Sequence, residues 1–188
     1  EIAVKVMLPG LLEKAGARER FMSEAKLSIK LSHQNIVKVY DVQHDGNLHF
    51  ITMELLEGKT LRSAMKRFDV AETVRIGKSL CEALGYAHQQ TVHRDVKPEN
   101  VFLGEDGTVK LMDFGIARVM SASQLTVTGA SMGTAYYMAP EQLKGSKEVD
   151  ARADQYSTAV VLYEMLTGDV PAGRMKPVRE KRKDCPKK

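Results

Sequence analysis

The chain has 188 residues, of which 43% are hydrophobic and 28% charged, and its formal net charge is +4. This composition is typical of a soluble intracellular enzyme, and no apolar run approaches the roughly 20 residues that a membrane helix needs. No signal peptide is visible, so we expect a cytoplasmic location. The two cysteines, Cys81 and Cys185, have no spacing typical of a metal site or a disulfide framework, which favours two reduced thiols.

The first elements each carry one charged residue of interest. An apolar run from Ile2 to Val6 predicts a strand that carries Lys5. A helix is expected from about Ala17 to Leu31, with Glu24 near its middle and Arg20 one turn earlier. Further elements are expected in this order: a strand at 50–53 that runs into the segment 54–58, helices near 60–67 and 73–90, and strands at 100–103 and 108–112 that form a hairpin turning at 105–107.

Two polar segments lie beside this hairpin in the sequence. The segment 93–100 reads HRDVKPEN, and DFG follows at 113–115, eighteen residues after Asp95. Together they supply a carboxylate that can accept a proton, a lysine, and two oxygen ligands for a metal ion. Phosphoryl transfer needs this set, whereas a generic core does not. The plain alternative is a polar loop with an ordinary Asp-Gly turn.

The last third of the chain contains the segment GTAYYMAPE at 133–141 and an expected helix at about 151–166. Residues 174–188 then hold eight lysines and arginines against two acidic residues. Such a basic run can bind nucleic acid. No aromatic residue interleaves these charges for base stacking, so we expect a solvated loop and no nucleic-acid partner.

The three segments HRDVKPEN, DFG and GTAYYMAPE resemble the catalytic loop, the metal-binding loop and the end of the activation segment of eukaryotic-type (Hanks-type) serine/threonine protein kinases, especially bacterial ones. A given residue occurs by chance about one time in 20, so agreement at about eight fixed positions is not expected from an unrelated chain. The resemblance implies an α+β, two-lobed protein-kinase-like fold, with a small β-lobe and a mainly helical large lobe.

The same resemblance implies an incomplete catalytic domain, truncated at both ends. Residues 1–58 would form a partial small lobe and hinge, without the first two strands and the Gly-rich loop. Residues 59–188 would form a partial large lobe with the catalytic loop and activation segment, without the last helices. We therefore expect that this fragment alone can be inactive.

For the chemistry, the resemblance implies ATP and Mg²⁺ as cofactors. Asp95 would accept the proton of the substrate hydroxyl, and Lys97 would neutralise charge on the γ-phosphate. Asn100 and Asp113 would bind Mg²⁺ through oxygen atoms, which this ion prefers. Lys97 also favours serine or threonine over tyrosine as the target. Thr134 would contact the catalytic aspartate and lysine near the docked protein substrate.

For the adenine, the resemblance makes Met53 the gatekeeper residue. The backbone groups of Glu54 and Leu56 would read the edge of the base. Ala3 and Phe102 would sandwich the ring, although an ordinary core phenylalanine is an equal alternative for Phe102.

Other residues would support this site. Lys5 would hold the α- and β-phosphates and pair with Glu24, a pair that contributes only about 0 to 1 kcal/mol when exposed and so serves positioning. His93 would pack under the phenylalanine of DFG. Asp154 would hold the catalytic-loop backbone, although it also suits an ordinary helix start. Ser28 is a departure, because its position normally carries an apolar side chain.

Regulation is implied as well. Arg94 directly precedes the catalytic aspartate, and kinases with this arginine are commonly switched by phosphorylation of the activation loop. Arg20 and Arg118 would join it in binding a phosphothreonine, which adds a charge of about −1.5 to −2. Thr126 and Thr128 are the best candidate sites, and self-phosphorylation is one route to their modification. Serines of the same stretch compete with them, and a simple flexible loop is the alternative.

Three function classes remain at this point. The first is an ATP-dependent kinase for Ser/Thr side chains of protein substrates. The second is a non-catalytic kinase-fold module that binds nucleotide or partner proteins. The third, a small-molecule kinase, is disfavoured by the segment 133–141, which docks a protein substrate in the family. The complete catalytic set favours the first class, because a binding module has no need to keep every member.

Overall fold

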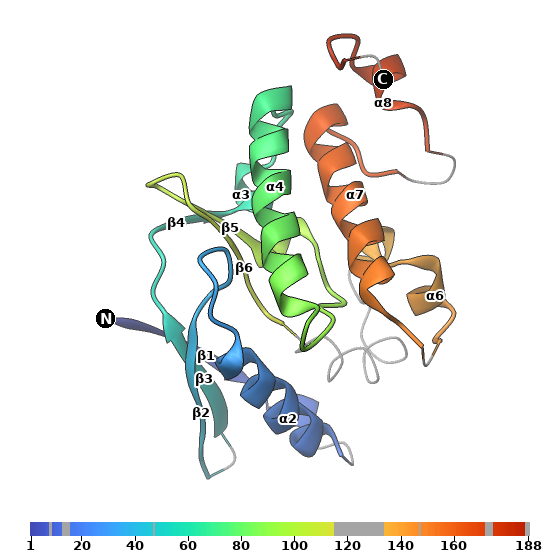
Figure 1. Cartoon of the computed structure of the whole chain (residues 1–188). Helices are drawn as coiled ribbons and strands as arrows, with labels where there is room; N and C mark the ends of the chain where they lie inside the picture. The colour runs from blue at the N-terminus through green and yellow to red at the C-terminus, as the bar shows by residue number, and fades with distance from the viewer. Residues whose placement is uncertain are drawn as a thin grey trace.

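The computed structural model describes residues 1–7, 9–12, 16–46, 48–114, 134–146, 148–171 and 175–186. A small sheet with one long helix forms one lobe, and the other is mainly helical and carries a second small sheet (Figure 1). This is the α+β, two-lobed architecture that the sequence predicts. In the part of the chain that the structure describes, no helix has the length and apolarity that crossing a membrane requires.

The small lobe is a three-stranded antiparallel sheet with a helix packed against it. Strands β1 (Ile2–Met7), β2 (Val39–Asp45) and β3 (Leu48–Glu54) lie in the order β1-β3-β2. The short helix α1 (Pro9–Leu12) precedes the long helix α2 (Ala17–Lys30). The first strand and the long helix therefore end within one residue of their predicted bounds. The core of this lobe consists of Met7, Ala17, Phe21, Ala25 and Ile51.

A second antiparallel sheet follows the hinge. Its strands β4 (Gly58–Thr60), β5 (Val101–Gly104) and β6 (Val109–Leu111) lie in the order β4-β5-β6. The hairpin between β5 and β6 turns at 105–107, as predicted. Gly58 has a φ of 143°, and a Cβ there would collide with the Leu103 carbonyl oxygen, so this position requires glycine.

The remaining elements of the large lobe are helical. They are α3 (Leu61–Ala64), α4 (Val70–Ala87), the 3₁₀ turns η1 (Pro98–Asn100) and η2 (Thr134–Tyr137), α6 (Pro140–Leu143), α7 (Ala151–Thr167) and α8 (Val178–Lys181). Asp69 caps α4 by accepting a hydrogen bond from the Glu72 N–H at 2.7 Å, and Asp150 caps α7 in the same way. Gly168, with a φ of 80°, ends α7.

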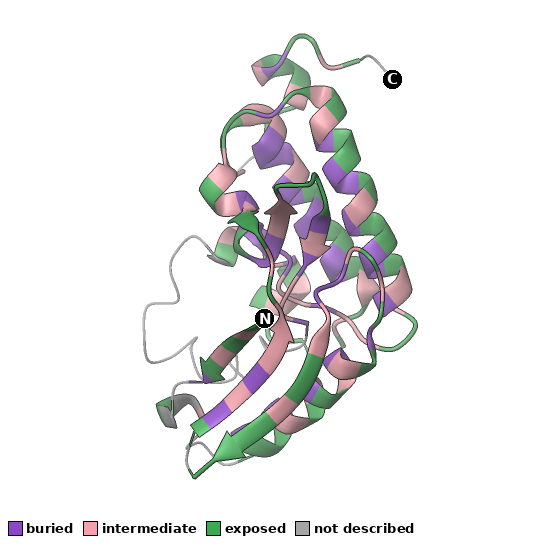
Figure 2. Cartoon of the chain, turned by 90° about the vertical axis from the view of Figure 1, so that its left-hand side faces the viewer, coloured by how far each residue is buried: buried purple, intermediate pink, exposed green. Residues whose placement is uncertain are grey.

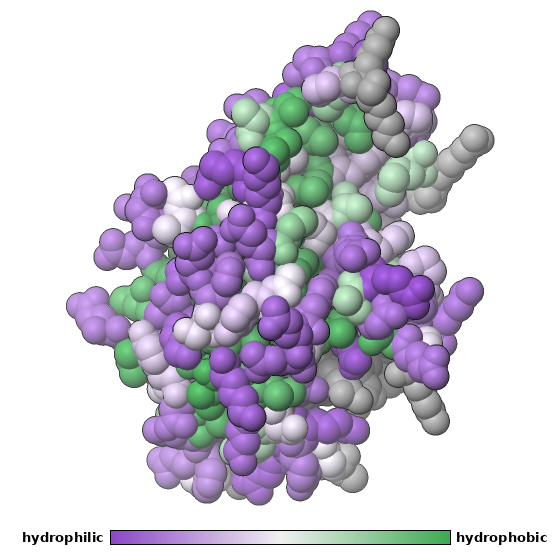
Figure 3. All heavy atoms as spheres, viewed as in Figure 1, coloured by the Kyte–Doolittle hydropathy of each residue, from purple (hydrophilic) through white to green (hydrophobic). Residues whose placement is uncertain are grey.

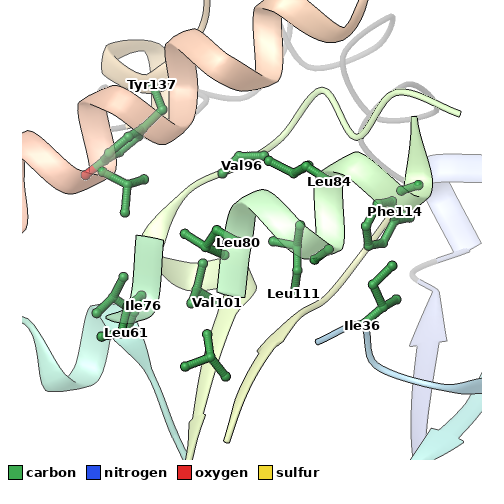
Figure 4. Close-up of a cluster of buried hydrophobic side chains, with 14 of the residues drawn as sticks. Ile36, Leu61, Ile76, Leu80, Leu84, Val96, Val101, Leu111, Phe114 and Tyr137 are labelled. Carbon is green, nitrogen blue, oxygen red and sulfur yellow. The ribbon is translucent and has the colours of Figure 1, made fainter. Parts of the chain in front are cut away.

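The core of the large lobe lies where α4, α7 and the second sheet meet. Figure 4 shows apolar side chains from these elements pointing toward one another, with Phe114 at one end of the cluster and Tyr137 near α7. In Figure 2 the buried residues follow the inward faces of the helices and strands. In Figure 3 hydrophilic residues cover most of the visible face, and hydrophobic atoms gather along the seam between α4 and α7.

Two predicted helices have different bounds in the structure. The helix expected at 60–67 ends at Ala64, because the Phe68 N–H donates a hydrogen bond to the Met165 carbonyl of α7 at 2.8 Å instead of continuing the helix. The helix expected at 73–90 begins three residues earlier, at Val70, because Asp69 caps it there.

Candidate active site

Asp154, near the start of α7, holds the backbone of the HRDVKPEN segment. Its Oδ2 accepts a hydrogen bond from the His93 N–H at 2.8 Å, and its Oδ1 accepts one from the Arg94 N–H at 2.7 Å. His88 Nε2 lies 2.8 Å from Oδ2. Burial alone would raise the pKa of the Asp154 carboxyl, but these donors together lower it below its ordinary value. The predicted backbone-holding role of Asp154 is therefore confirmed.

His93 lies beneath the DFG motif. Its ring is buried against Phe114, with ring centroids 4.5 Å apart. Nε2 lies 2.8 Å from the Met112 carbonyl oxygen, and Nδ1 accepts a hydrogen bond from the Asp95 N–H. Through its two ring nitrogens His93 links the two segments. The predicted packing of His93 under Phe114 is confirmed.

Asp95 presents a carboxylate with one oxygen occupied. Lys97 Nζ lies 2.8 Å from Asp95 Oδ2, and Asn100 Nδ2 donates to the same oxygen at 2.9 Å and to the Asp95 carbonyl at 2.8 Å. Among the described contacts Oδ1 carries no such bond, so it is the oxygen on which a substrate hydroxyl can place its proton. Since the Asn100 amide nitrogen is used, its oxygen is the atom left for a metal ion.

Asp113 is held in place by the backbone bond of the preceding residue, Met112, and by an ion pair with Lys5. The Met112 N–H donates to the Asn100 carbonyl at 2.9 Å, which ties the DFG segment to the catalytic loop. Lys5 Nζ, from β1 in the small lobe, lies 2.6 Å from Asp113 Oδ2. Arg94 and Asp113 have φ values of 68° and 63°. Positive φ is uncommon outside glycine and tends to occur where a side chain must be aimed for function.

The predicted residues of the adenine site fall into two groups. Glu54, Leu56 and Phe102 line a cavity of about 430 Å³ beside the hinge. Met53 instead lines a second cavity of about 20 Å³ between the lobes, together with Asp113 of the predicted metal site. Ala3 is in the lining of neither cavity. The Glu54 side chain turns to Lys110, whose Nζ lies 2.7 Å from Glu54 Oε1, and no sequence pattern indicates this contact.

The remaining small-lobe residues lie on elements that face the cleft. Ala3 pairs with Met53 across β1 and β3, two positions before Lys5 on the same face of its strand. Glu24 and Arg20 lie on α2. The ion pair described for Lys5 goes to Asp113, and the pairing of Lys5 with Glu24 stays a prediction.

Ser28, the departure from the family pattern, is buried behind the DFG motif. Its Oγ lies 3.1 Å from the Phe114 carbonyl oxygen and 3.1 Å from the Glu24 carbonyl oxygen. The hydroxyl thus has acceptors in place of the apolar contacts that the family pattern leads one to expect. It connects α2 directly to the backbone that follows Asp113.

The regulatory residues are only partly visible. Thr126, Thr128 and Arg118 lie outside the described residues, and of Thr134 only the backbone is described, at the start of η2. Arg94 Nη2 donates to the Val149 carbonyl at 3.2 Å. Its Nε is buried and has no partner among the described residues.

Gln142 is a supporting residue that sequence reasoning did not identify. Its side-chain oxygen accepts a hydrogen bond from the Ala139 N–H at 3.0 Å, and its Nε2 donates to the Arg94 carbonyl at 2.8 Å. It therefore joins the segment 133–141 to the catalytic loop. The only sequence signal is its place directly after the Ala-Pro-Glu triplet.

Comparison with known proteins places this arrangement in a family. A family model described as the protein kinase domain matches residues 1–187. A probable serine/threonine-protein kinase of Clostridium acetobutylicum is 39% identical over 181 residues, which cover 94% of this chain and 27% of that protein. The probable serine/threonine-protein kinase PknB of Corynebacterium glutamicum is 44% identical, covering 91% of this chain and 28% of that protein.

A solved structure agrees with these relatives. The crystal structure of the Mycobacterium tuberculosis PknI kinase domain superposes with a TM-score of 0.79 at 30% identity, covering 97% of this chain and 72% of that one. The chain belongs to the protein kinase domain family, and its relatives are bacterial kinases of the serine/threonine class. It spans little more than a quarter of the length of the two curated relatives.

Proposed function

We propose that this chain carries the catalytic core of an ATP- and Mg²⁺-dependent protein kinase that transfers the γ-phosphoryl group to serine or threonine hydroxyls of protein substrates. The observation that carries the proposal is the Asp95 carboxylate, whose Oδ2 is held by Lys97 and Asn100, while Oδ1 carries no bond among the described contacts. Such positioning suits phosphoryl transfer, in which the protein mainly orients groups and stabilises charge.

The oxygen atoms of Asn100 and Asp113 fit a magnesium ion. Mg²⁺ takes oxygen ligands, usually one or two from the protein, with substrate phosphates and water completing the shell. The bond from Asn100 Nδ2 to Asp95 leaves the amide oxygen for this use. When bound, the ion neutralises charge on the β- and γ-phosphate oxygens. Lys5, 2.6 Å from Asp113 Oδ2, is close enough to bind phosphate oxygens at the same place.

In this proposal residues 1–58 hold the nucleotide from one side, and residues 59–188 supply the catalytic loop and the protein-docking segment. Lys97 and the names of the relatives support serine or threonine as the target. A cytoplasmic location, where ATP is abundant, is part of the proposal.

We propose also that phosphorylation of Thr126 or Thr128 switches the activity. The buried Arg94 Nε supports this, because a buried guanidinium donor gains from an anionic acceptor. Arg20 and Arg118 are the further cations of the proposed phosphothreonine site.

The test is transfer of labelled γ-phosphate to a generic Ser/Thr protein substrate by the full-length protein, beside this 188-residue chain and an Asp95→Asn variant. We expect transfer by the full-length protein and none by the variant, since the amide cannot accept the hydroxyl proton. If the folded full-length protein binds nucleotide but transfers nothing, a non-catalytic module replaces the proposal.

A further inference from the structure

The side chain of Arg62, on the short helix α3, bonds to three other segments at once. Its Nε donates to Glu99 Oε1 at 2.8 Å, its Nη1 to Glu164 Oε1 at 2.8 Å, and its Nη2 to the Tyr137 hydroxyl at 2.5 Å. Tyr137 in turn donates to Glu164 Oε2 at 2.5 Å. The guanidinium also lies 5.9 Å from the centre of the Tyr137 ring.

The network is built around a buried charge. The Glu164 side chain is only 7% exposed, and an ionised carboxylate at such a depth is costly unless it is paired. Burial, followed by the bond to Glu164, raises the pKa of the Tyr137 hydroxyl, so it stays a donor. Burial alone would lower the pKa of Arg62, but its bonds to Glu164, Glu99 and Tyr137 raise it overall. Arg62 therefore stays charged and the Tyr137 hydroxyl stays protonated, as their bonds require.

The three partners belong to parts of the proposed active site. Glu99 lies in η1, directly before the metal-binding candidate Asn100. Tyr137 ends η2, in the segment expected to dock the protein substrate, and Ser157 Oγ fixes its backbone by donating to the Tyr137 carbonyl at 2.6 Å. Glu164 belongs to α7, the helix that also carries Asp154.

We infer that Arg62 is a positioning residue for phosphoryl transfer, which fixes the end of the catalytic loop at Glu99 relative to the protein-docking segment at Tyr137. This inference rests on the proposed kinase function. The arginine fork is required, because its nitrogens point in separate, fixed directions toward three acceptors. Lysine offers its donors from a single atom and cannot reach all three.

The test compares Arg62→Lys and Arg62→Ala with Arg152→Ala in the full-length protein. Arg152 is a suitable control, because its side chain is 82% exposed and bonds only to Asp150 among the described residues. Each protein is assayed for kcat, for KM with ATP and with protein substrate, and for thermal unfolding. Misplacement of reacting groups by about 1 Å costs on the order of 100-fold. We therefore expect kcat to fall by about 10- to 100-fold in both Arg62 variants, with KM for ATP changing less than about 2-fold.

The results distinguish failure of the positioning role of Arg62 from failure of the proposed kinase function. If Arg62→Lys keeps kcat within about 2-fold of the parent while folded, the fork has no positioning role and the inference is wrong. If the parent itself transfers no phosphate, the proposed function fails. In that case hydrogen exchange of the amides at 99–101 tests separately whether Arg62 fixes the end of the catalytic loop. Faster exchange there in both Arg62 variants, but not in Arg152→Ala, supports the positioning role, whereas unchanged exchange contradicts it.

Discussion

At the scale of single residues, the groups that fix the active site are more numerous than those that take part in the reaction. Asp154 touches no reacting atom in the proposed transfer, yet its two oxygens accept bonds from the backbone N–H groups of His93 and Arg94. These residues directly precede Asp95. A displacement of the Asp154 side chain would therefore move Asp95, the proposed base.

Replacing Asp154 with asparagine should destabilise the protein by about 1 to 3 kcal/mol, because the amide nitrogen would face a buried N–H donor. The pKa of Asp154 is lowered in the folded state from an ordinary value of 3.8. Its ionised form thus stabilises the fold above about pH 4, and this contribution is lost as the pH falls through the lowered folded-state pKa. Urea unfolding of both proteins from pH 7 to pH 3 measures the difference.

Asp169→Asn is the matched control, since its carboxylate is 64% exposed and pairs only with Lys181 among the described residues. The Asp154 variant should lose stability at pH 7, where the control does not. Equal stability of the two variants would mean that Asp154 does not hold the catalytic loop.

Asp113 and Asp95 should separate binding from transfer. Asp113→Asn should abolish Mg²⁺-dependent nucleotide binding, because an anionic ligand and the partner of Lys5 are both lost. Asp95→Asn should leave nucleotide binding intact while removing transfer. Titration with a fluorescent ATP analogue in the presence and absence of Mg²⁺ measures the binding step. Equal loss of binding in both variants would contradict this division of roles.

At the scale of elements, the packing of α4 on α7 determines where the catalytic loop can sit, because α7 carries Asp154. The helices approach closely at Gly77, where an added Cβ would lie 3.2 Å from one methyl carbon of Leu162 and 3.3 Å from the other. Gly85, two turns later in α4, has open space around the same position. The two glycines therefore permit a direct comparison.

Gly85→Ala should stabilise the protein by about 0.5 to 1 kcal/mol, because alanine loses less backbone entropy in a helix. Gly77→Ala gains the same propensity but must displace Leu162, so its net effect should be smaller or destabilising. Thermal unfolding of the two single variants measures the difference. A Gly77→Ala protein as stable as Gly85→Ala would mean that Leu162 can move to make room for the added methyl group between α4 and α7.

Sequence patterns predicted the helices and strands that carry the motifs more accurately than the helices and strands that carry none. Strand β2 was not predicted, although Asp45-Gly46 before a second apolar run is a typical hairpin signal. The motif segments were sufficient to locate Asp95, Lys97 and Asn100 in one constellation. No local pattern could identify Arg62, because its partners lie 37, 75 and 102 residues away along the chain.

At the scale of the whole molecule, the proposed activity depends on how the lobes and the activation segment are arranged together. Ser28 links α2 to the Phe114 carbonyl, and Gln142 links the segment 133–141 to the Arg94 carbonyl. Lys5 reaches Asp113 from the small lobe. These three contacts join the segments that surround Asp95.

Thr126→Ala combined with Thr128→Ala should lower the activity of the full-length protein without loss of folding. The reason is that the proposed phosphothreonine would no longer neutralise Arg94 and order the loop. Activity of phosphorylated parent and double variant, with circular dichroism as the folding control, measures this effect. Unchanged activity in the double variant would remove the proposed switch.

Among the described residues, the backbones of the two lobes are joined at two separate places, in addition to the side-chain contacts of Ser28 and Lys5. One is the covalent hinge at 54–58, and the other is the stretch at 35–37, whose backbone exchanges hydrogen bonds with Leu111 at 2.8 and 3.0 Å. Two attachments define a line, about which one body can rotate but along which it cannot slide without breaking bonds. In the proposed kinase, rotation about this line would open the lobes without breaking these backbone bonds, and the distance from Lys5 Nζ to Asp113 Oδ2 would measure the opening.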